Sequence, residues 1–141
     1  MLLKLINKFH TRDPFEIASS LGIIVLYERL GTINGYYHTA YRQKFIHINC
    51  DLPYYRQLFT MAHELAHAVL HPKSNTPFLT EYTLFSVNKL EREANKFAVN
   101  LLICDSDLKN YVISDYTISQ IASIYGLPTE LIELRLETFS I

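Results

Sequence analysis

The spacing of apolar residues divides the first part of the chain into a helix, a strand and a hairpin. Asp13-Pro14 is a helix-start signal, and the apolar residues after it recur at helical spacing up to the next glycine. Ile23–Tyr27 is a short, mostly β-branched run, which predicts a strand buried on both faces or nearly so. Residues 36–41 and 44–50 flank a tight Arg42-Gln43 connection, and this pattern predicts a β-hairpin.

The rest of the chain is predicted to be mainly helical. A long helix opens at Asp51 and Pro53 and ends at Pro72, because proline cannot continue a helical hydrogen-bond ladder. Further helices are predicted over residues 88–104, 117–125 and 129–139. This order predicts an α+β fold in which a small, mostly antiparallel sheet with a hairpin packs against the long helix and a second helix, followed by short C-terminal helices.

Length, composition and charge narrow the class of protein. At roughly 100–200 residues per domain, the 141 residues predict one domain over residues 1–141, with about 105–141 as a C-terminal helical subregion. The net charge of −1 provides no global reason to bind nucleic acid or an anionic membrane. Two cysteines are too few to staple a secreted domain, and no apolar run approaches a membrane span. We therefore expect a cytoplasmic protein that does not bind membranes.

The long helix carries the sequence His63-Glu64-Leu65-Ala66-His67, an HExxH motif. Positions four apart lie about 40° apart around a helix and about 6 Å along it, so both imidazoles can reach one metal ion. Glu64 lies one residue around the helix, where it can face a metal-bound water and act as a general base. The simpler alternative is an amphipathic helix whose polar face only meets solvent, and a third ligand would weaken that alternative.

The second helix offers two carboxylates as the third protein ligand that a catalytic zinc site needs. Helical projection places Glu91 inside the apolar arc and Glu93 just outside its other edge. A carboxylate in a core is costly unless a cation compensates it, so Glu91 is favoured as the ligand. Asn95, one turn later, could orient a ligand through its amide. The competing interpretation is that Glu91 completes a helix cap with Asn88.

Two histidines and a glutamate predict metal-assisted hydrolysis of a peptide bond. The same ligands also suit Fe(II), although the free central glutamate of HExxH favours zinc. His71 lies about 12 Å along the helix from His63, too far to share its metal, and we expect a supporting role for it. The hairpin could present an edge strand to an extended substrate. Candidates for a donor to the charge on the substrate carbonyl, among which the sequence does not choose, are Tyr36, Tyr37, Tyr82 and His38.

The helix–glycine–helix stretch over residues 118–128 is also compatible with DNA binding. Residues 105–141 contain two cations and six acids, a net charge of −4, whereas phosphate binding needs the opposite sign. We expect this region to pack or to dock a partner, with no direct contact to nucleic acid.

Three segments carry a specific combination of motifs. Ile17-Ala-Ser-Ser-Leu-Gly-Ile23 precedes a strand, Phe59–His71 contains HExxHxxxH, and Glu91-Arg-Glu-Ala-Asn95 supplies ExxAN. In this order they resemble the ImmA/IrrE family of metallopeptidases over most of the chain. The resemblance implies that His63, His67 and Glu91 bind one zinc ion and that Glu64 is the catalytic base. Where the family often has Met-Pro after a double leucine, this chain has Ile103-Cys104, a departure at a helix end and away from the chemistry.

The resemblance also implies a biological role. The best-known members of the family are regulators encoded by mobile elements, prophages or stress-response loci, and they relieve repression of transcription by cleaving a helix-turn-helix repressor. We therefore expect a zinc-dependent endopeptidase that acts on a helix-turn-helix repressor encoded nearby. The alternative is a metal-dependent regulatory protein that inactivates a repressor by contact, without proteolysis. The sequence leaves the oligomeric state open.

Overall fold

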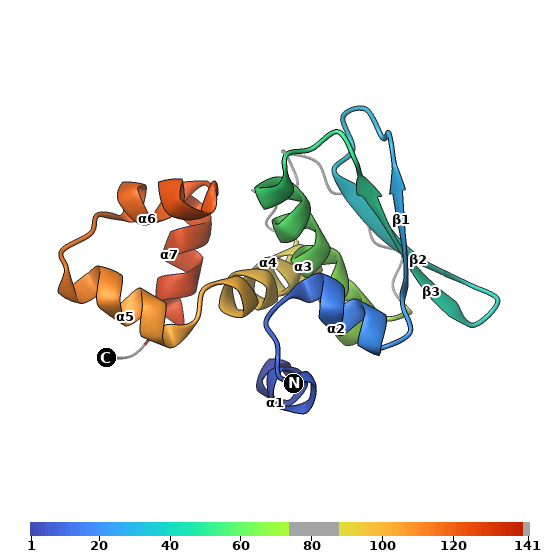
Figure 1. Cartoon of the computed structure of the whole chain (residues 1–141), viewed down its shortest axis with the longest axis horizontal. Helices are drawn as coiled ribbons and strands as arrows, with labels where there is room; N and C mark the ends of the chain where they lie inside the picture. Colours follow the sequence, from blue (N-terminus) through green and yellow to red (C-terminus); the bar gives the residue numbers. More distant parts are fainter. Residues whose placement is uncertain (74–87, 140–141) are drawn as a thin grey trace.

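A computed structural model describes residues 1–73 and 88–139, and these contain seven helices and three strands (Figure 1). The N-terminal elements are α1 (Leu2–Phe9), α2 (Pro14–Ser20), β1 (Ile24–Glu28), β2 (Gly35–Ala40) and β3 (Gln43–Asn49). The remaining helices are α3 (Tyr54–Leu70), α4 (Lys89–Leu102), α5 (Asp105–Ile113), α6 (Ile118–Tyr125) and α7 (Thr129–Glu137). The predicted α+β class is confirmed. None of the described helices combines the length and apolar character needed to cross a membrane.

The three strands form a mixed sheet in the order β1-β3-β2. β2 and β3 pair antiparallel as the predicted hairpin, whereas β1 runs parallel to β3. Ala40 pairs with Gln43, so the turn consists of Tyr41 and Arg42, both with positive φ (53° and 64°). The hairpin connection predicted at Arg42-Gln43 was therefore wrong by one residue. Side chains as large as Tyr and Arg are not typical of this left-handed turn, so the residue types did not mark its position.

The prediction that the first strand is buried on both faces was wrong. β1 lies at the edge of the sheet, where Ile24 and Tyr27 are 41% and 55% exposed. α2 packs on β1, and α3 packs on β2 and β3, so helices cover one face of the sheet (Figure 1). A run of apolar residues thus marks a strand here but does not show that both of its faces are covered.

The core around α3 sets the distance between this helix and the sheet. Buried aliphatic residues of the sheet, including Ile46 and Ile48, pack in one cluster with Met61, Leu65 and other residues of α3. At Gly35 a Cβ atom would lie only 2.6 Å from Thr60 Cγ2 and from the His47 carbonyl oxygen. Glycine at the start of β2 therefore allows the strand to approach α3 closely.

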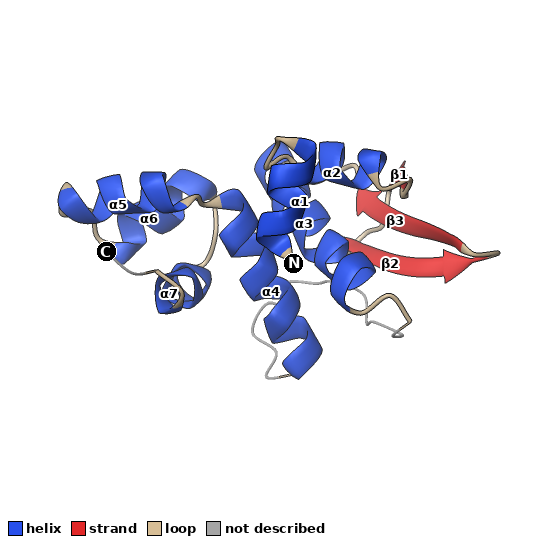
Figure 2. Cartoon of the chain, turned by 90° about the horizontal axis from the view of Figure 1, so that it is seen from below, coloured by secondary structure: helices blue, strands red, loops and turns tan. Residues whose placement is uncertain are grey.

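A second, smaller core joins the C-terminal helices at the end of the molecule opposite the sheet (Figure 2). Its buried residues are Ile103, Leu108, Ile121, Ala122 and Ile132. The predicted helices over 117–125 and 129–139 are confirmed as α6 and α7, and that over 88–104 as α4. The sequence analysis did not predict α1 and α5.

Candidate metal centre

The HExxH motif lies in the second half of α3, on the side of the helix that meets α4. His63, Glu64 and His67 are fully buried. The alternative of a helix whose motif face only meets solvent is therefore wrong. A buried polar side chain requires a partner, so the surroundings of these three residues determine what the helix does.

The N-terminus of α4 places the second carboxylate against α3. Asn88 caps this helix, because its Oδ1 accepts hydrogen bonds from the backbone N–H groups of Leu90 (2.9 Å) and Glu91 (3.4 Å). The Glu91 side chain is almost fully buried and turns toward the two motif histidines. The first turn of α4 is thus capped through the Asn88 side chain, and the Glu91 carboxylate is used in the contact with α3.

Three potential ligand atoms converge from the two helices. The Nε2 atoms of His63 and His67 are 3.2 Å apart, and they lie 3.0 and 2.8 Å from the two carboxylate oxygens of Glu91. Ligands at 2.0–2.1 Å from a tetrahedral zinc ion are about 3.3 Å from one another. Among the described residues, this is the group of three or more whose ligand atoms are close enough to hold one metal ion. The donor set and its spacing therefore fit zinc.

Each imidazole has a partner on its other nitrogen. Asn95 Oδ1 lies 2.8 Å from His63 Nδ1, and His67 Nδ1 lies 3.1 Å from His71 Nδ1. A histidine that binds a metal normally donates its second N–H in this way, which fixes the ring and directs the other nitrogen at the metal. The structure therefore places Asn95 and His71 behind the motif histidines, as supporting groups.

Glu93 ends this chain of contacts and does not reach the three converging atoms. Its Oε2 lies 2.7 Å from His71 Nε2, and its side chain is 41% exposed. The order of contacts is thus Glu93, His71, His67, and the Glu93 carboxylate at the outer end can accept a hydrogen bond from the Nε2–H group of His71. Glu91, the residue that helical projection favoured, therefore lies at the two motif histidines, and Glu93 does not.

The two buried carboxylates of the centre, those of Glu64 and Glu91, differ in how far neighbouring groups stabilise their negative charge. Among the described residues, neither carboxylate oxygen of Glu64 has a hydrogen-bond partner. Burial raises the pKa of Glu64 to about 7, an effect that His63 opposes and the Glu91 charge reinforces. Burial also disfavours the charge on Glu91, but hydrogen bonds from His63 and His67 outweigh it and lower the pKa of Glu91 to about 2. Neighbouring carboxyl groups whose pKa values are shifted in opposite directions are typical of functional sites.

The candidate donors to the substrate carbonyl that lie on β2 do not all face the same side of the sheet. The Tyr37 side chain lies in the core on the α3 side, where its hydroxyl donates to the Pro72 carbonyl oxygen (2.8 Å). Tyr36 and His38 alternate with it and lie on the opposite face, away from the metal centre. Tyr82 is outside the described residues. Strand alternation in the sequence could have separated Tyr37 from the other two.

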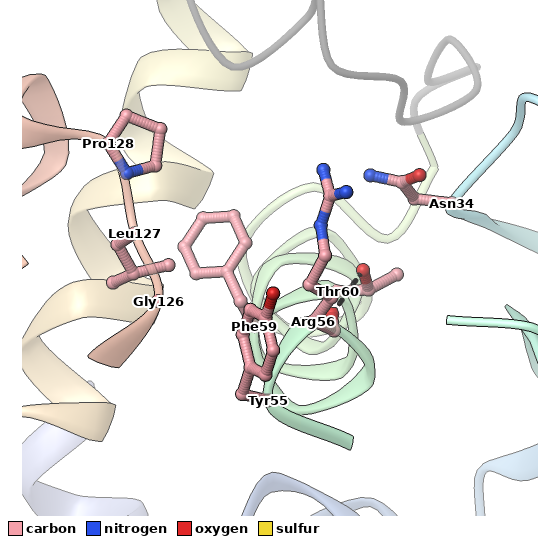
Figure 3. A pocket seen from close by; sticks show the side chains of 8 residues that line it. All are labelled: Asn34, Tyr55, Arg56, Phe59, Thr60, Gly126, Leu127 and Pro128. Atoms are coloured by element: carbon pink, nitrogen blue, oxygen red, sulfur yellow. Dashed lines mark hydrogen bonds between the residues drawn. The ribbon is translucent and has the colours of Figure 1, made fainter. Parts of the chain in front are cut away.

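A cavity of about 220 Å³ lies beside the first half of α3 (Figure 3). Thr60, one turn before His63, and Arg56, one turn earlier, are among the α3 residues that line it, and the Thr60 hydroxyl donates to the Arg56 carbonyl oxygen (2.7 Å). The other lining residues are Asn34, Tyr55, Phe59, Gly126, Leu127 and Pro128. Sequence reasoning missed this cavity because it depends on how the α6–α7 connection packs near α3.

A helix bearing HExxH, with a buried carboxylate supplied by a second helix, defines a metal-dependent peptidase class. In agreement, the model of the IrrE N-terminal-like domain family matches residues 18–137. The chain belongs to this family of metallopeptidases, and the predicted resemblance to ImmA/IrrE is confirmed.

Two relatives extend this result. The chain is 44% identical over 133 residues to "Uncharacterized immunity region protein 2" of Bacillus phage phi105, covering 94% of this chain and 84% of the relative. It is 32% identical over 130 residues to "Metallopeptidase ImmA" of Bacillus subtilis strain 168, covering 89% and 76% of the two chains. No solved structure matches the chain significantly.

Proposed function

We propose that the chain is a zinc-dependent endopeptidase in which His63, His67 and Glu91 hold the metal ion and Glu64 is the general base. The observation that carries this proposal is the convergence of three buried ligand atoms from α3 and α4, all within 4.8 Å of one another. Glu64 supports it, because a fully buried carboxylate without a hydrogen-bond partner among the described residues is costly unless it has a chemical role.

Each side chain of the proposed site has a separate role in peptide hydrolysis. Zinc, when bound, polarises the substrate carbonyl and lowers the pKa of water. Glu64 takes the proton from the attacking water and passes it to the leaving amine. Burial favours the protonated form of Glu64, so this side chain is a better proton acceptor than an exposed carboxylate. Asn95 and His71 hold the imidazole rings in place behind the metal.

We propose a helix-turn-helix repressor, encoded near this gene, as the substrate. The relative from phage phi105 is named for an immunity region, and the relative from Bacillus subtilis is named a metallopeptidase, which together support proteolysis in phage regulation. A cytoplasmic location is part of this proposal. β2 is an edge strand of the described sheet and could pair with an extended peptide, and the cavity beside Arg56 and Thr60 could receive one of its side chains.

The test uses the purified chain, the repressor encoded beside its gene, and the variant Glu64→Gln. We expect cleavage of the repressor by the unaltered chain and a rate about 10²- to 10⁴-fold lower in the variant, the usual effect of removing a general base. Zinc should remain bound in Glu64→Gln, because its three ligands are unchanged. Equal release of the repressor from its operator by both proteins would instead support inactivation by contact without proteolysis.

A further inference from the structure

A second group of histidines lies on the face of the sheet that is turned away from α3. The Nε2 atoms of His38, on β2, and His47, on β3, are 2.9 Å apart. On its other side, His47 Nδ1 contacts a carboxylate oxygen of Glu28, at the end of β1. These three residues come from three different strands and share no residue with the centre between α3 and α4.

Both rings are held in position by aromatic neighbours. His47 is only 7% exposed, and its ring stacks on that of Tyr36 with the centroids 4.2 Å apart and the planes 8° apart. The His38 ring stacks on Phe45 in the same manner, with 5.1 Å between centroids and 10° between planes. In each stacked pair the two residues face each other across the hairpin. The two imidazoles are therefore directed at one another before any ligand arrives.

The carboxylate of Glu28 determines which nitrogen of His47 is available. His47 Nδ1 donates its proton to Glu28, so the Nε2 of a neutral His47 carries a lone pair and points at His38. A carboxylate on one imidazole nitrogen, with the other nitrogen free to bind, is the usual arrangement behind a metal-bound histidine.

We propose that His38 and His47 form a second metal site, for zinc or a similar late first-row divalent ion, with Glu28 as the carboxylate that orients His47. Imidazole nitrogen is a preferred donor for these ions. In a tetrahedral zinc site the two nitrogens would be about 3.3 Å apart, so a small rotation of His38 opens the present spacing sufficiently. On binding, the proton that His38 Nε2 donates to His47 Nε2 in the metal-free chain moves to His38 Nδ1 through solvent. Both Nε2 lone pairs then bind the metal, and water fills the remaining positions.

This site differs from the α3–α4 centre in what it can do. With two protein ligands it binds metal more weakly than a buried site with three, and the partly exposed Glu28 shows that solvent reaches its edge. Among the residues that the structure describes, none of its contacts is a buried carboxylate comparable to Glu64 that could serve as a general base. We therefore infer an exchangeable metal site on the outer face of the sheet, occupied after the α3–α4 centre is filled.

The test is equilibrium dialysis of the full chain against zinc chloride, with bound zinc counted by elemental analysis. At micromolar free zinc we expect His38→Phe to bind one equivalent less than the unaltered chain, because the phenyl ring keeps the stacking on Phe45 but offers no ligand. Glu28→Gln should keep this equivalent with an affinity about 10- to 100-fold lower, as for other partners of metal-bound histidines. Thr39→Val, an exposed position on the same hairpin, is the matched control and should bind as the unaltered chain does.

Imidazole proton resonances provide a second measurement that does not depend on a variant. In the unaltered chain the resonances of His38 and His47 should shift with the last equivalent of zinc and be unaffected by the first. Equal zinc content in the unaltered chain and His38→Phe, or no response of these two histidines, would overturn the proposal. The dialysis experiment measures the difference in bound zinc between the unaltered chain and His38→Phe. It therefore tests the second site even if the α3–α4 centre does not bind zinc.

Discussion

Glu91 and Glu93 are two residues apart on α4, and exchanging each for glutamine tests the proposal that Glu91 is a metal ligand and Glu93 a supporting carboxylate. The Glu91 oxygens lie 2.8 and 3.0 Å from the two histidine Nε2 atoms, in a fully enclosed position. Glu93 contacts His71 instead, and solvent reaches its side chain. Both substitutions remove one negative charge from the same turn of one helix, so each is the control for the other.

The magnitudes follow from these positions. Removing a partner of a metal-bound histidine typically costs 10- to 100-fold in metal affinity, or about 1.4–2.8 kcal/mol at 1.4 kcal/mol per factor of ten. Glu91→Gln removes the proposed anionic ligand itself, so its loss of zinc affinity should exceed the upper end of this range. Glu93→Gln acts through two imidazoles from a half-exposed position, so it should cost less than about tenfold.

The measurement is a competition titration of each purified variant against a chromophoric zinc chelator. Circular dichroism of both variants shows whether the helices are retained, so that loss of fold is not mistaken for loss of a ligand. A Glu93→Gln variant that loses as much zinc affinity as Glu91→Gln, or more, would refute the choice of Glu91 as the third ligand.

Two further predictions concern supporting contacts. Asn95→Ala should lower zinc affinity about 10- to 100-fold in the same chelator titration, because it removes the oxygen that holds the first motif histidine; unchanged affinity would contradict that role. Arg135→Met should lower the free energy of unfolding by about 1–3 kcal/mol in urea titrations, because the buried guanidinium donates to the Ile103 carbonyl oxygen at 2.8 Å. Asp105→Asn, which alters its exposed partner, should cost less than about 1 kcal/mol, and an equal loss would contradict this explanation.

The sequence predicted the parts of the site that depend on helical spacing. The common face of His63 and His67 follows from 3.6 residues per turn, and projection of α4 separated Glu91 from Glu93 before their surroundings were known. The contacts of His71 with Glu93 and of His38 with His47 were not predicted. They depend on the distance between separate elements, which no local pattern contains.

The missed elements have different causes. The apolar residues Leu2, Leu5, Ile6 and Phe9 recur at helical spacing, so a signal for α1 was present in the sequence. Acidic residues in the first turn of α5, such as Asp105, also favour a helix start. By contrast, the parallel pairing of β1 with β3 and the exposure of β1 are determined by packing between distant segments, which hydrophobicity along the chain does not record.

The position of α4 between α3 and α7 would link binding of the proposed metal ion to the folding of the C-terminal helices. α4 presents Glu91 to α3 and packs against α7, with Arg92 bonded to Glu137 and Asn100 to Thr138. A ligand that binds only the folded chain stabilises every segment needed to build its site. Loading the metal should therefore slow amide hydrogen exchange in α7, which contributes none of the proposed ligands. A repressor or other partner that loosens α7 would weaken metal binding by the same free energy.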